Sequence, residues 1–410
     1  MSAPNVLLLA VDSLRADAVF GAHIPTPTFD AYAARGAVFR QCICTATTTT
    51  PSFSSILTGC YPPKHGVRGL QGYSLAPQVT TAAEAFAAAG YHTYAEVTGP
   101  LLPETGVLRG FAEARHRPGY RAPFFGWRDE VIARMKEYQN PWFMLLHIWE
   151  VHRPFRSPPD FKRRWDRAGY EAAVEASDQH LAPVLEAAGD NTIIVITGDH
   201  GEEYPDTQLG VKLVSAARRF RKKAKPARWF PALDKQLQEM QVGHGFALRE
   251  QLVRVPLIIS GPGVPRADIA DQVRHVDLFP TLADLAGVGI PPGIDGRSLR
   301  PLWDEGGSLT EEPAYMEAVG VKLEGRKILG ARTPDWKLLR MPGGRNALHK
   351  LNGGAAPDEK RNLYRQYPEV AHRLELYIEE VNAASVVVES GMTSEQEAVV
   401  EQHLKDLGYL

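Results

Sequence analysis

Cysteine is scarce in this sequence, where Cys42, Cys44 and Cys60 are the only three among 410 residues. An odd and sparse set of thiols excludes the disulfide framework of small secreted proteins. Long apolar runs near the start are also missing, since residues 6–11 form a run that is too short for a signal peptide core or a membrane span. We therefore expect a cytoplasmic protein.

An excess of either charge is missing as well. The chain has 46 Lys and Arg against 48 Asp and Glu, for a net charge of −2 at pH 7. A chain without a basic excess does not attract nucleic acid through its overall charge, so we expect no nucleic acid partner. Its 44% hydrophobic and 23% charged residues are ordinary globular values, and its length accommodates one large α/β domain and a smaller one.

Apolar runs alternate with helical patterns over most of the chain, which is typical of a mostly parallel sheet covered by helices on both faces. The runs are continuously apolar, as strands buried on both sides are. We predict strands at residues 5–11, 142–149, 191–197 and 252–259. Helices are predicted at residues 28–36, 81–90, 125–139 and 170–186, and another from His275. The predicted fold class is therefore α/β, with a mostly parallel central sheet flanked by helices.

The pattern changes near residue 310. Residues 314–319, 327–332 and 336–341 alternate like short antiparallel strands, and residues 368–381 read as a helix. We predict a catalytic domain over 1–310 and a small C-terminal α+β subdomain over 311–385. The tail, 386–410, is predicted to contain a last helix ending at Gly408, because Thr393 and Gln396 have the spacing of a capping box.

Four consecutive threonines, residues 47–50, precede Pro51. Proline is favoured at the first helical position, so a short helix is predicted to begin at Pro51. Thr49 or Thr50 would then lie at a helix N-terminus, where free N–H groups and the helix dipole stabilise an anion. A hydroxyl held there is a candidate nucleophile, and the alternative is a plain threonine-rich cap.

Polar residues follow three of the predicted strands. Asp12 ends the first, His152 lies just past the second, and Asp199 and His200 follow the third between two glycines. Ligands of open α/β sheets bind at the carboxyl ends of strands, and carboxylates with imidazoles are typical transition-metal ligands. The structural alternatives are that Asp12 caps a helix and that His152 is a satisfied core histidine.

A basic insertion at residues 204–241 interrupts the pattern. Its part at 212–230 holds eight Lys and Arg residues and ends in Trp229 and Phe230. Three interpretations remain open: a solvated helical face, a basic lid that attracts an anionic substrate, or a surface that contacts anionic lipid. His244, between two glycines just after the insertion, is a candidate metal ligand or proton donor.

Taken in order, these segments resemble the sulfatase branch of the alkaline phosphatase superfamily. The likeness is carried by residues 5–17, 26–39, 57–67, 143–155, 191–202, 243–259 and 275–299. Sulfatases of this family carry a Cys(or Ser)-x-Pro-x-Arg signature, whose first residue is oxidised to formylglycine. The corresponding positions here are Thr49, Pro51 and Phe53. Threonine carries a methyl group on the carbon that would become the aldehyde, so it cannot yield formylglycine.

Other family features also differ. The paired aspartates after the first strand are Asp12 and Ser13, and residues 96–99 replace a Gly-Lys-Trp-His stretch, so sulfate-binding cations are missing. A threonine at position 49 is instead similar to the nucleotide pyrophosphatase/phosphodiesterase branch, where threonine is the nucleophile. That resemblance implies one complete metal site, which phosphonate monoester hydrolases share apart from their formylglycine: Asp12, Thr49, Asp199 and His200.

A second metal site is matched only in part. His244 matches one of its histidines, whereas Glu150 and His152 approximate the other ligands at a different spacing. The resemblance therefore implies one divalent cation and leaves the second open. A donor set of carboxylates and imidazoles favours zinc or manganese over calcium.

The chemistry implied is ester hydrolysis by in-line attack of Thr49. The expected substrates are phosphate diesters, phosphate monoesters or phosphonate esters, and His152 or His244 would protonate the leaving group. Two alternatives stay open: a sulfuric ester hydrolase or phosphotransferase that uses the unmodified Thr49, and a non-catalytic anion-binding homologue. The expected partner is an anionic small-molecule or lipid-like ester, with membrane contact possible through residues 212–230 and the oligomeric state open.

Overall fold

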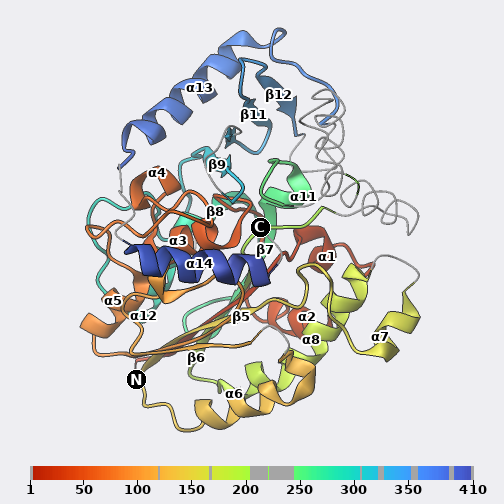
Figure 1. The fold of residues 1–410 in the computed structure, drawn as a ribbon, viewed down its shortest axis with the longest axis vertical. Helices are drawn as coiled ribbons and strands as arrows, with labels where there is room; N and C mark the ends of the chain where they lie inside the picture. The colour runs from red at the N-terminus through yellow and green to blue at the C-terminus, as the bar shows by residue number, and fades with distance from the viewer. Residues whose placement is uncertain are drawn as a thin grey trace.

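Two sheets organise the chain, and the larger one carries the site. The computed structural model describes residues 3–118, 121–165, 169–203, 220, 244–304, 307–321, 327–351, 359–386 and 392–407. The central sheet and its helices form the lower body in Figure 1, and the smaller sheet lies above them beside α13. The predictions for the basic insertion at 204–241 lie outside the described residues, Phe220 apart.

The central sheet has eight strands in the order β4-β3-β5-β1-β6-β7-β2-β8. Its pairings are parallel except that β7 runs antiparallel to both of its neighbours, β6 and β2. The α/β prediction of a mostly parallel sheet is therefore confirmed. The strands are β1 (Asn5–Val11), β2 (Ala37–Ile43), β3 (His92–Val97), β4 (Glu113–His116), β5 (Trp142–Ile148), β6 (Thr192–Gly198), β7 (Arg254–Ser260) and β8 (Ala267–Arg274).

All four predicted strands are present, as β1, β5, β6 and β7, with small shifts at their ends. The largest shift affects the strand predicted at 252–259, whose first residues belong to the short helix α11 (Glu250–Val253). The order of the strands places β1 between β5 and β6, with Val11 paired to both Ile148 and Gly198. These three strands consequently end at the same level of one sheet edge.

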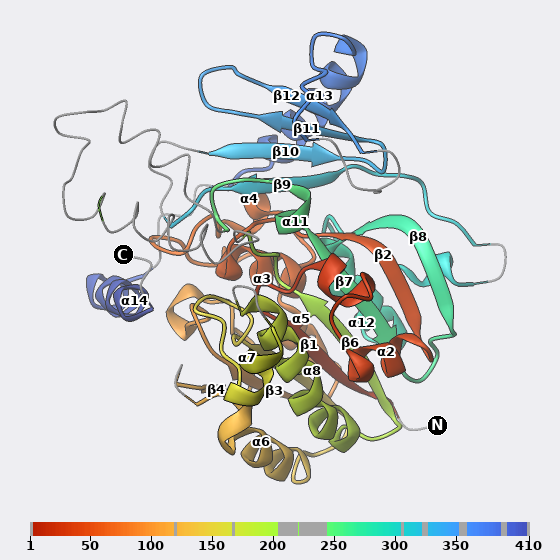
Figure 2. The same cartoon turned by 90° about the vertical axis from the view of Figure 1, so that its right-hand side faces the viewer.

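Helices cover both faces of this sheet, as Figures 1 and 2 show from two sides. Along β6, Ile193 and Val195 join the core under α3, α5 and α12, whereas Ile194 and Ile196 join the core under α2, α6 and α8. This alternation explains why residues 193–196 of the strand are all apolar. The helices are α1 (Ala16–Phe20), α2 (Pro27–Ala33), α3 (Thr49–Thr58), α4 (Pro62–His65), α5 (Ala82–Ala88), α6 (Trp127–Met135), α7 (Pro159–Arg164), α8 (Tyr170–Ala187) and α12 (Leu278–Ala286), the last preceded by a 3-10 turn at His275–Asp277.

The prediction that a helix begins at Pro51 is wrong, because α3 begins at Thr49 with Thr48 as its cap residue. The first N–H groups of a helix have no partner within it, so a proline at the third position loses no helical hydrogen bond. Thr49 is therefore the first helical residue, and the threonine run enters the helix instead of only preceding it.

The second sheet is antiparallel, in the order β12-β11-β10-β9. Three of its strands and α13 match the predicted ones, and β12 was not predicted. The predicted capping box is confirmed, since Thr393 Oγ1 accepts from Gln396 N over 3.3 Å and Gln396 Oε1 accepts from Thr393 N over 2.9 Å. The domain limits at 310 and 385 stay predictions. The elements are β9 (Ala314–Ala318), β10 (Ile328–Arg332), β11 (Trp336–Arg340), β12 (Ala347–Lys350), α13 (Pro368–Ala383) and α14 (Ser394–Asp406).

A buried charge cluster joins the two sheets. Glu250 of α11 accepts from Arg332 Nη2 of β10 over 3.0 Å and from Lys337 Nζ of β11 over 3.0 Å. Both cations are fully buried. Burial by itself would raise the pKa of Glu250, but Lys337 and Arg332 outweigh it and lower that pKa to about 2. The attachment of the second sheet therefore depends on this carboxylate being ionised.

Glu250→Gln is expected to lower the free energy of unfolding by about 3–5 kcal/mol, because it leaves the buried Arg332 without its carboxylate, whereas Lys337 keeps its ion pair with Glu359. Because the native pKa lies below the unfolded value of 4.5, the ion pair stabilises the wild type fully above pH 4.5 and loses this effect as pH falls toward about 2. The variant should lack this part of the pH dependence in urea unfolding curves.

The matched control is Asp268→Asn, which breaks an exposed pair with Arg40 between β2 and β8. An exposed pair contributes little, so this variant should lose less than about 1 kcal/mol. Equal losses in the two variants would contradict the role assigned to Glu250.

Candidate metal centre and nucleophile

Three neighbouring strands deliver the site. Asp12 follows β1, His147 is the penultimate residue of β5, and Asp199 follows β6. One ligand atom from each lies within 4.8 Å of the other two, and all three side chains are fully buried. Because β1 pairs in parallel with both β5 and β6, the register of the sheet brings these residues to one point.

Thr49 and His200 complete the group. The Thr49 hydroxyl donates to Asp12 Oδ2 over 3.2 Å and lies 3.5 Å from His200 Nε2. The same Nε2 lies 3.4 Å from Asp199 Oδ2 and 3.9 Å from Asp12 Oδ1. The structure therefore brings together the four residues that the sequence proposed for one metal site, Asp12, Thr49, Asp199 and His200.

In both carboxylates, Oδ1 accepts hydrogen bonds from neighbouring donors. Asp12 Oδ1 accepts from the Ser13 hydroxyl over 3.0 Å, and Asp199 Oδ1 accepts from the backbone N–H groups of Ser13 and His200 over 3.0 and 2.8 Å. Ser13 adopts a left-handed backbone with φ of 63°, an uncommon conformation for serine. Ser13 thus orients both carboxylates instead of supplying a further carboxylate.

The loop after β6 also needs a glycine. A Cβ on Gly201 would lie 1.9 Å from the backbone oxygen of Gln251, so only glycine allows this close approach. In return the Gly201 N–H donates to Leu252 O over 2.8 Å. The glycine that follows His200 therefore packs the ligand loop against the chain leading into β7.

The tautomers of two histidines leave lone pairs that face the carboxylates. His147 Nδ1 lies 3.0 Å from Thr98 O, and His200 Nδ1 lies 2.8 Å from Gly201 O, so each Nδ1 carries the proton that it donates. Each Nε2 then has a lone pair directed toward Asp12 or Asp199. Lone pairs that face carboxylates repel unless a cation lies between them.

Two buried atoms at the same point have no hydrogen-bond partner among the described residues, His147 Nε2 and Asp199 Oδ2. Burial raises the pKa of Asp199, and the neighbouring charge of Asp12 raises it further. Orphaned acceptors beside two close carboxylates fit a divalent cation, which would satisfy both atoms and offset the repulsion. The residues that fit this role are Asp12, Thr49, His147, Asp199 and His200.

A second histidine pair adjoins this centre. The ring of His244 stacks on that of His200 at 4.5 Å, and its Nε2 lies 3.3 Å from His152 Nε2. Burial lowers the pKa of His244, but Glu202, 3.1 Å from its Nδ1, outweighs burial and raises it. Burial lowers the pKa of His152 to about 4. His244 is therefore the better proton donor of the two.

The approximate match of Glu150 to a second metal site is wrong. Glu150 is buried and accepts from Arg117 Nη1 and Nη2 over 2.7 and 3.0 Å. Both of its oxygens are engaged with this guanidinium, so neither remains for a metal. Beside the first site, Phe53 fills the position that corresponds to the signature arginine, and its ring meets His147 edge-on at 4.9 Å.

Sequence reasoning missed His147. It lies inside an apolar run that was assigned only to a buried strand, and that run contains no other charged or hydrogen-bonding aliphatic side chain. The signal that could have identified it is a histidine one residue before the end of a central strand. On the adjacent strand His147 pairs with Ala10, two residues before Asp12.

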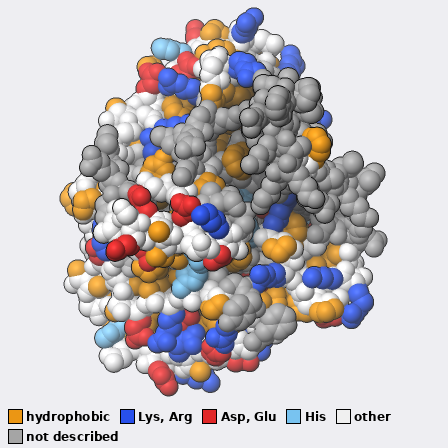
Figure 3. Space-filling model, viewed as in Figure 1, with side chains coloured by type: hydrophobic (Ala, Val, Ile, Leu, Met, Phe, Trp, Pro, Cys, Tyr) orange, Lys and Arg blue, Asp and Glu red, His pale blue; other side chains and the backbone are white. Residues whose placement is uncertain are grey.

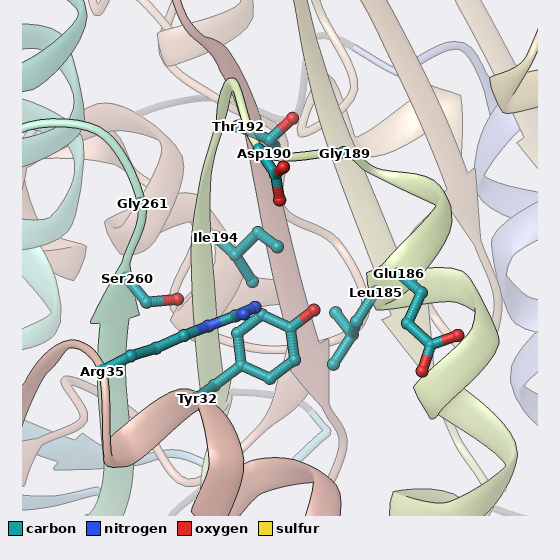
Figure 4. A pocket seen from close by; sticks show the side chains of 10 residues that line it. All are labelled: Tyr32, Arg35, Leu185, Glu186, Gly189, Asp190, Thr192, Ile194, Ser260 and Gly261. Carbon is teal, nitrogen blue, oxygen red and sulfur yellow. The ribbon is translucent and has the colours of Figure 1, made fainter.

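A separate cavity of about 390 Å³ lies elsewhere in the structure (Figure 4). It sits where β6 begins and β7 ends, at Thr192 and Ser260, whereas the ligands follow the other end of β6. Tyr32, Arg35 and Asp190 also line it. This cavity is therefore not part of the candidate centre. On the face shown in Figure 3, acidic and basic side chains are interspersed over the described surface.

None of the described helices combines the length and the apolar character that a membrane span requires. The predicted cytoplasmic location, the absence of a nucleic acid partner and membrane contact through 212–230 stay predictions.

Comparisons with known proteins find related sulfatases. The dog (Canis lupus familiaris) arylsulfatase K is 26% identical over 223 residues, which cover 51% of this chain and 35% of that protein. The chain thus spans about a third of the length of that relative. An uncharacterized sulfatase of Escherichia coli, YidJ, is 23% identical over 375 residues, covering 77% of this chain and 74% of that one.

Solved structures share the fold. The phosphonate monoester hydrolase of Agrobacterium radiobacter superposes with a TM-score of 0.73 at 18% identity, covering 93% of this chain and 95% of that chain. A 2-O GAG sulfatase superposes with a TM-score of 0.71 at 19% identity, covering 93% and 92%. Both structures share the fold of this chain, and their sequence identities are too low for a substrate to be transferred from them.

Family models match most of the chain. Residues 245–384 match the model described as N-sulphoglucosamine sulphohydrolase, C-terminal. Residues 4–288 match the model described as Sulfatase, which spans well over half of the sequence and includes every candidate site residue. The chain therefore belongs to the sulfatase family.

Proposed function

We propose that this protein is a metal-dependent hydrolase that cleaves phosphate or phosphonate esters with Thr49 as its nucleophile. The observation that carries the proposal is the place of the Thr49 hydroxyl, 3.2 Å from Asp12 Oδ2 and 3.5 Å from His200 Nε2. Thr49 stands where sulfatases have the residue that becomes formylglycine, and it offers an unmodified alcohol instead.

The residues of the chain divide the work. Asp12, His147, Asp199 and His200 hold the cation, with Thr49 beside them. A divalent cation bound there lowers the pKa of an adjacent hydroxyl and offsets the charge of a bound ester. Asp12 Oδ2 orients the hydroxyl by accepting its hydrogen bond. The N-terminus of α3, at which Thr49 lies, adds a smaller stabilisation of negative charge.

The reaction is an in-line displacement at phosphorus. The Thr49 hydroxyl releases its proton to solvent, a bond forms between Oγ1 and phosphorus while the bond to the leaving oxygen breaks, and His244 Nε2 gives its proton to that oxygen. Water then attacks the phosphothreonine and gives one proton to His244, while the Thr49 oxygen leaves phosphorus and takes up a proton from solvent. His152 accepts a hydrogen bond from protonated His244 and keeps Nε2 positioned, since His152 itself is neutral above about pH 4.

The donor set supports zinc or manganese as the metal. Two imidazoles beside two carboxylates suit these ions, whereas calcium prefers a shell of oxygens. Metal analysis of the protein as purified, with activity restored by each ion in turn, tests this choice. Restoration by calcium alone would contradict it.

A substrate panel tests the proposed reaction. Aryl esters of a phosphate diester, a phosphate monoester, a phosphonate and a sulfate are compared at saturating zinc or manganese. Turnover of phosphorus esters supports the proposal. Turnover of the sulfate alone would favour a sulfuric ester hydrolase that uses unmodified Thr49, which the sulfatase relatives support. Product phosphorylated on an added alcohol would favour a phosphotransferase, and no turnover at all a binding protein.

Singly charged esters are expected to be preferred over phosphate monoesters, which carry two charges. The signature arginine is replaced by Phe53, and the nearby Arg117 is already paired with Glu150. Because neither Phe53 nor the paired Arg117 offsets a second charge on the substrate, kcat/KM for a diester should exceed that for the matched monoester by at least about tenfold. The ratio is measured with two nitrophenyl esters above pH 7, where the monoester is doubly charged. A ratio below one would contradict this charge argument.

A further inference from the structure

We infer that the indole N–H of Trp149 donates a hydrogen bond to an oxygen of the bound ester. Trp149 follows β5, two residues after His147, and it is 5% exposed. This assignment rests on the proposed function, because it needs an oxyanion beside the metal ligands. It makes Trp149 a specificity-determining residue on the wall of the candidate site.

The indole nitrogen of Trp149 is a buried hydrogen-bond donor. Trp149 Nε1 has no hydrogen-bond acceptor among the described residues. A buried N–H without a partner costs about 1–3 kcal/mol, so each such group in a folded protein needs an explanation. A ligand oxygen that arrives with the substrate supplies one.

The indole ring of Trp149 stacks on His152, the histidine next to His244. Its plane stacks on the ring of His152 with centroids 4.7 Å apart and an interplanar angle of 23°. His152 in turn contacts His244, the proposed proton donor. Trp149 is therefore one ring away from the proposed proton donor.

Gly99 keeps a space open in front of the indole N–H. A Cβ at Gly99 would lie 3.5 Å from Trp149 Nε1 and 3.7 Å from His147 Cε1, so the two rings face the same small space. Gly99 has a φ of 63°, which disfavours any side chain there.

The Gly99 carbonyl is already engaged and does not serve the indole. It accepts from His116 Nε2 over 3.0 Å and from His403 Nε2 of α14 over 2.9 Å. The space beside His147 is thus lined by an unused donor and is free of any side chain from residue 99. A non-bridging oxygen of an ester held at the metal ligands fits this space.

The chemistry suits the rest of the site. A neutral N–H stabilises a phosphoryl oxygen without adding a full positive charge, and residues 96–99 carry no lysine here. A site with a neutral donor in this place binds a singly charged ester with less loss than a site that relies on lysine and arginine. The inference therefore points to phosphate diesters and phosphonate monoesters as the substrate class.

The test compares Trp149→Phe with the wild type and with Trp303→Phe. Phenylalanine keeps a ring to stack on His152 and removes only the donor. Trp303 is the matched control, since its Nε1 also lacks a partner among the described residues but its ring packs on Phe39, in the core under α12. The probe is inorganic phosphate, titrated into the zinc-loaded protein.

Trp149→Phe is expected to weaken phosphate binding at least about tenfold, and Trp303→Phe less than about twofold. In ¹⁵N spectra of the wild type, the indole N–H signal that disappears in Trp149→Phe should shift as phosphate is added. The Trp303 indole signal should stay in place. Where Trp149→Phe is unstable, assignment of the seven indole signals of the wild type by nuclear Overhauser contacts decides the question instead.

The outcomes separate this inference from the proposed function. If the wild type hydrolyses phosphorus esters, but Trp149→Phe leaves phosphate affinity unchanged and the Trp149 signal does not shift with phosphate, Trp149 is not a donor and the proposed function stands. If the Trp149 signal shifts with phosphate but no ester is hydrolysed, the donor role stands and the proposed function is wrong.

Discussion

Thr49→Ala is expected to abolish ester hydrolysis, lowering kcat at least about 10,000-fold at saturating metal. The alanine variant keeps the helix start and the other four metal ligands but lacks the attacking oxygen. Thr49→Ser retains an alcohol at the same place and should keep measurable turnover. Stopping the wild-type reaction in acid should leave one phosphoryl group on the peptide that contains Thr49, which mass spectrometry detects.

Thr50→Ala is the matched control for this loss. Thr50 is the next residue of α3, but its hydroxyl donates to Pro100 O over 3.0 Å instead of facing the carboxylates. Removing that hydrogen bond should cost about 1 kcal/mol of stability and leave kcat nearly unchanged. Unchanged hydrolysis in Thr49→Ala would end the nucleophile hypothesis, and equal losses in both variants would assign the effect to the helix.

The effect of Asp199→Asn on stability is expected to change sign between the zinc-bound and the metal-free protein. The asparagine Oδ1 can still accept from the Ser13 and His200 N–H groups, so the loop keeps its shape. With zinc, the variant should bind the ion at least about 100-fold more weakly and melt at a lower temperature than the wild type. After chelation it should melt at a higher temperature than the wild type, because one of two buried, repelling carboxylates is gone.

The control substitution is Asp178→Asn. Asp178 is also buried, and its carboxylate accepts from the Thr28 and Phe29 N–H groups at the start of α2 over 3.0 and 2.8 Å. It lies away from the centre, so its loss of stability should be the same with and without zinc. Calorimetry of the three proteins in zinc and in chelator measures both effects. A lower melting temperature for Asp199→Asn in both states would argue against a cation between the carboxylates.

Local patterns predicted much of the fold. Strand β1, Asn5–Val11, is apolar from Val6 onward because both faces of the strand are covered, and it was located to the residue. The capping box of α14 was predicted from two residues, because a cap depends on the backbone within one turn. The start of α3 was misplaced by two residues, since proline is tolerated throughout the first helical turn and does not mark one position in it.

The candidate site was predicted where a polar residue follows an apolar run, and it was missed or misjudged elsewhere. Asp12, Asp199 and His200 each follow an apolar run closely, which marks them as residues at a strand end. His147 does not, because it lies within the run and only its partners across the sheet show which way it points. Glu150 carried the right chemistry for a ligand, and only the buried Arg117 beside it shows that its oxygens are taken.

The sequence by itself determined four strands of the central sheet, three of the second sheet, most helices and the identity of the alcohol at position 49, because each follows from residues that are neighbours in the chain. The tertiary structure alone decided which polar side chains meet. Ser13 and Asp199 are 186 residues apart and Thr49 lies 37 residues from Asp12, and they come together because β1 is placed between β5 and β6. Strand order and register are set by the packing of the whole sheet, which no local pattern encodes.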